Sequence, residues 1–302
     1  MSTSAYDVGA GGLAGAPTRS ARPAARRYKL LPTVALVAGA IYCLLPVLWV
    51  VIALTKTRGE LFSTDTFLPS FGPGLVENLS DLSAYEGGRF WRWSLDSVFY
   101  AGVGSGLSAV VSALAGYGLA KYRFHGRNTM FNILLAGVLM PQIILAIPQY
   151  LLLAKVGLAG TYWSVLLPTI ISPFGIYLCR VYAAASVPTE TLEAGRIDGA
   201  GELRLFRSIA LPMMGPALVT VFLLQFVATW NNFLLPYIML SDGDTFPLTT
   251  GLFTMLNQGA QQPALYSLVI AGVVLSIIPL IALFLTLQRY WRIDLISGGL
   301  KG

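Results

Sequence analysis

The side chains with the clearest chemical potential are polar residues inside long apolar runs. Two Pro-Gln pairs place Gln142 and Gln149 seven residues apart, and Gln225, Thr229 and Asn232 follow at spacings of four and three. Each spacing puts its side chains on one face of a helix. Uncharged amides and hydroxyls can hydrogen-bond a sugar, on which aromatic rings such as Tyr150 and Trp230 could stack. These residues are therefore candidates for lining a substrate pathway.

The same five polar side chains also have a structural interpretation. Polar groups between membrane helices hydrogen-bond across the bundle, and prolines free backbone carbonyls that amides can satisfy. The spacing alone leaves both interpretations open.

Enzyme chemistry finds little support in the sequence. The single histidine, His125, stands in a short basic loop, and no G-x-x-x-x-G-K-[ST] stretch is present. No paired Cys/His spacing suggests a metal. Asp96 is the acid closest to a span, and we expect it at the outer mouth of that span rather than buried within it. We therefore expect no catalytic residue, no metal and no cofactor bound by this chain.

Composition identifies the elements that must position these residues. Of 302 residues, 55% are apolar and 11% are charged, whereas soluble domains carry about 25% charge; the mean hydropathy is +0.68. A span needs about 20 apolar residues, and continuous rather than alternating runs favour helices over barrel strands. The sequence predicts an all-α integral membrane protein with six transmembrane helices: 30–55, 97–120, 128–154, 156–179, one after Pro212 within 208–241, and 264–287.

The basic residues predict the orientation of these helices. Fifteen of the twenty Lys and Arg residues fall on the side that holds both termini, which the positive-inside rule makes cytoplasmic. The net charge of +6 is spread between the apolar runs instead of forming one patch, which argues against nucleic acid as a partner. We expect a disordered basic tail over 1–28 and a six-helix domain over 29–302. The aromatics Phe90, Trp91 and Trp93 are interpreted as an anchor at the outer interface.

The cytoplasmic loop at about 184–212, hereafter the elbow, carries the strongest local signals. Pro188 suits the first turn of a helix, and Gly199 suits a left-handed end, with Gly201 as a second flexible point. A second short helix is expected to run to Ile209 and to stop at Leu211-Pro212. Apolar residues alternate with charges along the elbow: Leu192, Ile197, Leu203, Phe206 and Ile209. This pattern fits a packed cap and a docking element equally well.

The elbow resembles the EAA loop of binding-protein-dependent ABC importer permeases, E-A-A-x-x-D-G-A-x(5)-F-x(2)-I-x-L-P. The matching residues are Glu193, Ala194, Gly195, Asp198, Gly199, Ala200, Phe206, Ile209, Leu211 and Pro212. Stretches 115–127, 228–233 and 288–302 are similar to the carbohydrate branch, of the maltose permease type. The resemblance covers about residues 29–302.

Two positions depart from the family pattern. Gly195 replaces the second Ala of E-A-A, and a glycine within a helix costs about 1 kcal/mol relative to Ala, but its small size is kept. Asp96 stands where the family commonly has Asn, before Ser97.

The resemblance implies a type I ABC importer permease in the bacterial cell membrane. It implies a second permease subunit, an ABC ATPase dimer that uses ATP and Mg, an extracellular solute-binding protein, surrounding membrane lipid, and a sugar or oligosaccharide substrate. The elbow would enter a cleft on the ATPase, where Glu193 meets a basic group, Gly199 lets the backbone turn, and Phe206 and Leu203 fill the apolar part.

Other functions remain open on the residues alone. A secondary transporter or channel would act without an ATPase and predicts an inverted repeat or a coupling-ion acid. A structural subunit predicts a bundle without polar faces. Among importers, a peptide or phosphate permease is the nearest alternative to a sugar permease, and the sequence does not name the sugar.

Overall fold

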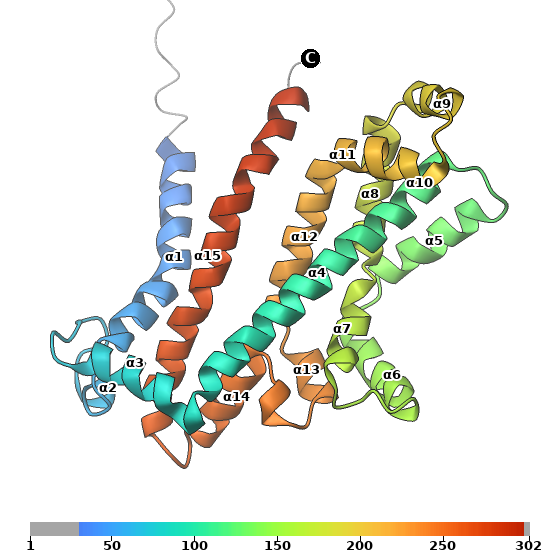
Figure 1. The fold of residues 1–302 in the computed structure, drawn as a ribbon. Coiled ribbons are helices and arrows are strands. Elements are labelled where there is room, and N and C mark those ends of the chain that lie inside the picture. The colour runs from blue at the N-terminus through green and yellow to red at the C-terminus, as the bar shows by residue number, and fades with distance from the viewer. Residues whose placement is uncertain (1–29, 299–302) are drawn as a thin grey trace, which may run out of the picture. The chain divides into compact units, whose positions relative to one another are not determined.

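The computed structural model describes residues 30–298, and all secondary structure in this part of the chain is helical (Figure 1). The predicted tail over 1–28 lies outside the described residues. The chain divides into two units, 1–48 and 49–302. The described part of the first unit belongs to α1 (Leu30–Leu54), an apolar helix. The site residues all belong to the second unit.

The second unit contains two long helices, α4 (Arg89–Lys121) and α15 (Ala264–Gly298). The other elements outside the elbow are α2 (Glu60–Ser63), α3 (Gly74–Ala84), η2 (Tyr85–Gly87), α5 (Arg127–Val138), α6 (Gln142–Lys155), α7 (Tyr162–Ile170), α8 (Pro173–Ser186), α12 (Gly215–Trp230), α13 (Leu234–Met239), η4 (Gly243–Thr245) and α14 (Leu248–Gln258). The elbow consists of α9 (Thr189–Ile197), α10 (Glu202–Leu205), the π-helical turn η3 (Phe206–Ala210) and α11 (Leu211–Met213).

Helix α4 is the centre of the second unit and packs against α7, α8, α12 and α14. Small residues let its neighbours approach closely. A Cβ on Gly116 would lie 2.6 Å from the Cys179 side chain of α8, and one on Gly104 would lie 2.8 Å from Thr169 Oγ1 of α7. Close approach through small residues is how membrane helices gain packing energy where lipid offers no hydrophobic drive.

Four helical stretches are long and apolar enough to cross a membrane, and six are present if each of two bent pairs counts as one span. The sixth predicted span agrees with the stretch Ala264–Gln288. The third is not straight, because α5 and α6 meet at 105° next to Pro141. The elbow and α12 form the second bent pair, at 76°. The fold is therefore all-helical, with four to six candidate spans.

The predicted fourth span is displaced along the sequence. It runs over Tyr162–Ser186 rather than 156–179, because Gly157 and Gly160 adopt positive φ values of 73° and 78° and form a turn before it. The span is also broken between α7 and α8, where Ile171 and Ser172 are extended. Pro173 then opens α8 and Ser172 Oγ accepts a hydrogen bond from the Gly175 N–H.

The predicted aromatic anchor at the outer interface is wrong for two of its three residues. Helix α4 begins at Arg89, so Phe90 and Trp93 lie in the core with 1% and 3% exposure. The Trp93 Nε1–H donates to the Gly243 carbonyl over 2.8 Å. Trp91 alone is exposed. The arginines Arg89 and Arg92 lie within this first part of α4 and pair with Asp244.

Candidate functional site

The first half of the elbow ends as the glycine pattern predicts. Gly199 has φ +81°, its N–H donates to the Arg196 carbonyl, and the Ala200 N–H donates to the Gly195 carbonyl over 2.9 Å. These two bonds form a Schellman ending, in which the residue after the cap is left-handed. Gly201, with φ −71°, has a backbone conformation that other residues also adopt, so its role as a second flexible point stays a prediction.

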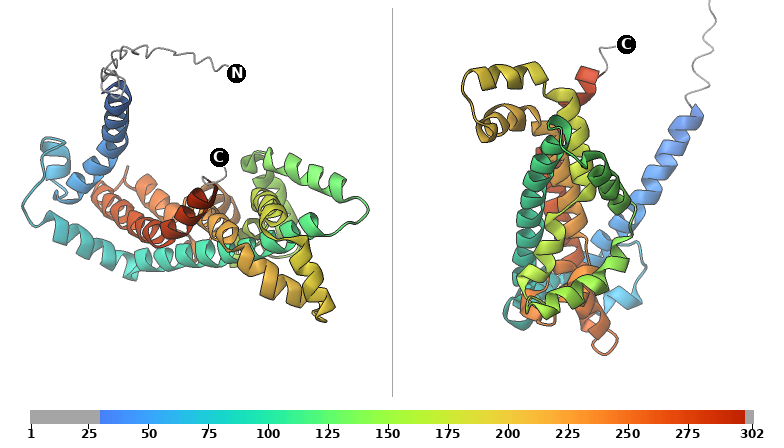
Figure 2. Two further views of the ribbon diagram at one scale, coloured as in Figure 1. Left: turned by 90° about the horizontal axis from the view of Figure 1, so that it is seen from above. Right: turned by 90° about the vertical axis from the view of Figure 1, so that its right-hand side faces the viewer.

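The second half of the elbow does not stop at Leu211-Pro212. The chain stays helical through α11 and bends at Met214, before α12. Pro212 is the second residue of α11, which follows the π-helical turn η3 directly, so the helix continues through a residue that has no N–H to donate. The elbow projects from one end of the second unit, and α13 and α14 lie at the opposite end (Figures 1 and 2).

The apolar residues of the elbow divide into a buried and an exposed set. Leu192 and Leu205 are buried, and Phe206 packs its ring 5.3 Å from that of Tyr117 on α4. Phe206 is therefore part of the chain's own core, and the prediction that it fills a partner's cleft is corrected. Leu203 is 76% exposed and Ile197 is 87% exposed. Sequence periodicity could not separate the two sets, because the turn at Gly199 sets which faces meet.

The departure at Gly195 has a local packing role. A Cβ at this position would lie 2.5 Å from Leu205 Cδ2 and 3.2 Å from Ile209 Cδ1. Leu205 is fully buried, so its methyl has little room to move. The small residue thus lets the two halves of the elbow pack against each other.

One charged contact fastens the elbow to the end of α4. Glu202 accepts hydrogen bonds from Arg196 Nε over 2.8 Å and from the hydroxyl of Tyr122, the residue after α4. The Arg196 hydrogen bond, followed by that of Tyr122, lowers the pKa of Glu202 below its usual value. Glu193 and Asp198 are exposed, and among the described residues they form no ion pair. The other predicted elbow residues lie at its surface or edge: Ala194, Ala200, Leu211 and Pro212.

The five predicted pathway residues line one cavity of about 550 Å³, hereafter the polar cavity. Its walls are residues of α5–α8, α12 and α13 and of the segments that connect them. They are Gln142, Gln149, Gln225, Thr229 and Asn232. The residues that line this cavity carry no charged side chain. The spacing argument thus brought the right residues together, and their contact with a substrate stays a prediction.

Two of these five residues are used by the fold. Gln225 Nε2 donates to the Thr169 carbonyl over 3.3 Å, and that carbonyl has no helical partner because Pro173, four residues on, lacks an N–H. Asn232 lies beyond the end of α12, so its predicted helical face is wrong, and its Oδ1 accepts from the Leu235 N–H.

The other three residues have polar side chains that the fold does not pair, but only the amides of Gln142 and Gln149 are accessible from the cavity. Thr229 is 7% exposed, and its Oγ1 is buried without a hydrogen-bond partner among the described residues. Gln142 and Gln149, both on α6, have no side-chain hydrogen bond within that part of the chain either. Sequence reasoning missed Thr169 and Ser172, which also line the cavity. Pro168 and Pro173 were the available sequence signal for the helix break beside these two residues.

The predicted aromatic platform is not formed. Trp230 is 4% exposed and stacks on Phe226 with ring centroids 5.7 Å apart, and neither Trp230 nor Tyr150 lines the cavity.

Asp96 is buried, contrary to the expectation of an acid at the outer mouth. It is 8% exposed, because α4 starts seven residues earlier. Its Oδ1 accepts a hydrogen bond from the Tyr162 hydroxyl over 3.1 Å, whereas Oδ2 has no partner among the described residues. It does not line the polar cavity.

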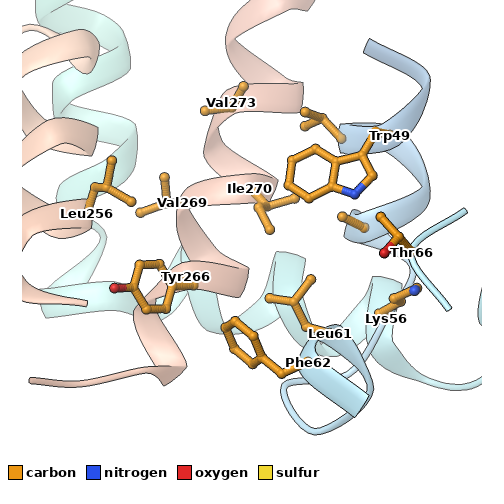
Figure 3. Close-up of a pocket in the computed structure, with 12 residues that line it drawn as sticks. Trp49, Lys56, Leu61, Phe62, Thr66, Leu256, Tyr266, Val269, Ile270 and Val273 are labelled. Carbon is orange, nitrogen blue, oxygen red and sulfur yellow. The ribbon is translucent and has the colours of Figure 1, made fainter. Parts of the chain in front are cut away.

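A second cavity, of about 430 Å³, lies between residues 49–66 and helices α14 and α15 (Figure 3). Apolar side chains such as Leu61, Phe62 and Ile270 dominate its lining. Lys56 reaches its edge, but its ammonium group donates to the Asp65 carbonyl over 2.5 Å. The lining of this cavity contains no amide side chain, and its hydroxyls belong to Thr66 and Tyr266.

Comparison with known proteins identifies the family. Residues 108–292 match the model of the binding-protein-dependent transport system inner membrane component. The chain is 40% identical over 217 residues to the arabinooligosaccharides transport system permease protein AraQ of Halalkalibacterium halodurans, covering 72% of this chain and 76% of the relative. It is 31% identical over 251 residues to the lactose transport system permease protein LacG of Rhizobium radiobacter, covering 83% and 89%.

The fold is also similar to that of a solved protein. A chain of a bacterial ABC transporter involved in the import of the acidic polysaccharide alginate superposes with a TM-score of 0.77 at 24% identity, over 91% of this chain and 99% of that one. The fold is that of an ABC importer permease. The matched family region contains the whole elbow and every residue that lines the polar cavity, and the chain belongs to the binding-protein-dependent transport system inner membrane components.

Proposed function

We propose that this chain is one of two permease subunits of a sugar importer, that it forms half of the translocation pathway, and that its elbow transmits movement from a separate ABC ATPase dimer. The ATPase would bind the ATP and Mg. The observation that carries this proposal is the elbow: a family-matching loop with a fixed left-handed turn and an exposed apolar tip.

The exposed side chains of the elbow suit a cleft on another protein. Leu203 and Ile197 present apolar surface, and Glu193 and Asp198 present carboxylates without an ion pair in the described part of the chain. Apolar side chains enter a partner's pocket while charges at the rim set orientation. A cleft with an apolar floor and a basic rim therefore complements the elbow.

The neutral lining of the polar cavity supports an uncharged sugar as substrate. Hydroxyl and amide groups bind a polyol through hydrogen bonds. An anionic substrate would be bound most strongly by Lys or Arg side chains, and the lining of this cavity contains neither. The names of two relatives, which refer to arabinooligosaccharides and lactose, agree with this class.

The proposed topology has six spans and both termini in the cytoplasm; α5 and α6 together form one span, and α12 forms another after the chain bends out of the cytoplasmic elbow. The segment 241–262, which contains α14, then faces the outside. It is the proposed contact for the solute-binding protein.

Copurification tests this function. The tagged full chain is solubilised gently from native membranes, and its partners are identified by mass spectrometry. The expected result is an ATPase, a second permease and a solute-binding protein, whose bound ligand names the sugar. A chain that purifies alone and moves solute without ATP overturns the proposal in favour of a secondary transporter.

Cross-linking tests the elbow itself. In a chain whose own cysteines are replaced, Leu203→Cys is expected to cross-link to the ATPase, and Phe124→Cys is not. Phe124 is a suitable control because it is 46% exposed in a different cytoplasmic loop. Equal cross-linking at both positions contradicts a specific contact at the elbow.

A further inference from the structure

The loop between α4 and α5 forms a cationic hollow that neither the elbow nor the polar cavity uses. The hollow has a volume of about 510 Å³ and is lined by residues 123–129, which include Arg123, His125 and Arg127. Arg123 and His125 are exposed and have no side-chain hydrogen bond among the described residues.

Two further observations show that this charge is uncompensated. Arg180 of α8 is half-buried, with its guanidinium carbon 3.4 Å from the ring centroid of Phe131, and it interacts electrostatically with Arg127. Arg127 donates to the Tyr122 carbonyl over 3.2 Å. Within the part of the chain that the structure describes, no carboxylate lies within 4.0 Å of either arginine. Guanidinium groups that are partly desolvated without a counter-charge favour binding of an anion.

The surface beside the hollow is apolar. Met130 and Ile133 of α5 are 53% and 68% exposed, and Tyr177 and Val181 of α8 are 36% and 49% exposed. Side chains of this kind require hydrocarbon around them in a membrane protein. The basic residues of the hollow thus lie next to an apolar helix surface, in the same way that the phosphate of a phospholipid lies next to its acyl chains.

We propose that Arg123, His125, Arg127 and Arg180 bind the phosphate group of an anionic phospholipid from the cytoplasmic leaflet, whose acyl chains lie along α5 and α8. The proposal depends on the orientation proposed above, which places this end of α4 in the cytoplasm. Planar guanidinium groups pair with phosphate oxygens in bidentate geometry, and each basic residue near an anionic membrane strengthens binding about fivefold.

The test measures the thermal unfolding of the full chain in detergent during titration with dioleoyl-phosphatidylglycerol. Dioleoyl-phosphatidylcholine and inorganic phosphate serve as comparison ligands. The expected result is that phosphatidylglycerol alone raises the unfolding temperature, because a ligand of the folded state stabilises it by mass action. Equal shifts with both lipids, or a phosphate effect that matches phosphatidylglycerol, overturn the proposal.

Charge variants locate the site. Arg123→Gln, which removes a side chain without a hydrogen bond, is expected to weaken phosphatidylglycerol binding about fivefold, and the Arg123→Gln/Arg127→Gln pair about 25-fold. The matched control is Arg204→Gln/Arg207→Gln, which removes two exposed charges from the same cytoplasmic side. Equal weakening by the two pairs contradicts a defined site.

The same titration separates this proposal from the proposed function. Copurification of the ATPase with Arg123→Gln reports on the importer, and lipid binding reports on the hollow. If the lipid effect is absent while the partners are retained, only the lipid site is lost.

Discussion

The elbow and the polar cavity have opposite constructions. The elbow is a continuous stretch, fixed by a Schellman turn, a buried Leu205 and a salt bridge between Arg196 and Glu202. The cavity collects residues from six helices and depends on interruptions in those helices. The proposed contact with the ATPase needs a rigid local shape, whereas the proposed substrate pathway needs polar groups that the helices do not fully use. Substitutions should therefore affect shape in the first region and substrate affinity in the second.

The largest effect is expected from Gly199→Val. The position has φ +81°, where a β-branched residue is strained, although a Cβ would meet open space. We expect the protein to stay in the membrane while uptake is abolished, measured as ATP-dependent sugar accumulation. Gly201→Ala is the matched control, because Gly201 is equally open and has φ −71°. Normal uptake by Gly199→Val contradicts a fixed turn.

Two substitutions in the cavity should distinguish a polar side chain that stabilises the fold from one that could contact substrate. Gln225→Ala leaves the Thr169 carbonyl unpaired and should reduce the free energy of unfolding by about 1–3 kcal/mol. Gln142→Leu removes an exposed amide of the cavity lining that has no side-chain hydrogen bond among the described residues, so it should keep stability and raise KM for uptake severalfold. Thermal unfolding and uptake kinetics measure both effects. Unchanged kinetics in Gln142→Leu would contradict a substrate contact at this residue.

Gly195→Ala restores the family residue and should nevertheless destabilise the elbow. The added Cβ meets Leu205 Cδ2 at 2.5 Å, and overpacking of about 1–3 kcal/mol exceeds the helix gain of about 1 kcal/mol. A second change, Leu205→Val, should recover the loss by shortening the neighbour. The measurement is the free energy of unfolding of the single and double variants, and a more stable single variant contradicts this packing.

The smallest effect is expected at the contact between Tyr122 and Glu202. Tyr122→Phe should lower coupling of ATP hydrolysis to uptake only slightly, because exposed charged contacts contribute about 0–1 kcal/mol. The lowered pKa of Glu202 means that its stabilisation is present above the usual value of 4.5 and is lost as pH falls through the lowered pKa. The ratio of uptake to hydrolysis should therefore be constant from about pH 6 to 8. A change within that window points to another titrating group.

The turn of the elbow could be predicted from the sequence, whereas the packing around the elbow and the cavity could not, for a physical reason. The turn at Gly199 depends on neighbours in the chain, so residue type and spacing were enough. The burial of Phe206 depends on Tyr117, which is far away in sequence, and no local pattern reports it. The same holds for Asn232, which reaches the cavity through a turn after α12 rather than along a helical face.

The predicted helix boundaries were wrong where contacts between distant segments, and not the length of the apolar run, determine where a helix begins or ends. The charges of Arg89 and Arg92 placed the start of the apolar run at Ser97, but both arginines pair with Asp244, and α4 begins at Arg89. Pro173 was visible in the sequence, whereas the unpaired carbonyl of Thr169 and its rescue by Gln225 became apparent only when both helices were placed.

The length of α4 has a mechanical consequence. Its first turns hold the segment after α13, through Trp93 and the Gly243 carbonyl, and its last turns hold the elbow, through Tyr117 and Phe206. A continuous helix of 33 residues is about 50 Å long, and tilting such a rod by about 5° displaces one end by about 4 Å relative to the other. If the elbow moves as proposed, α4 would therefore carry that movement directly to the segment after α13, without an intervening loop.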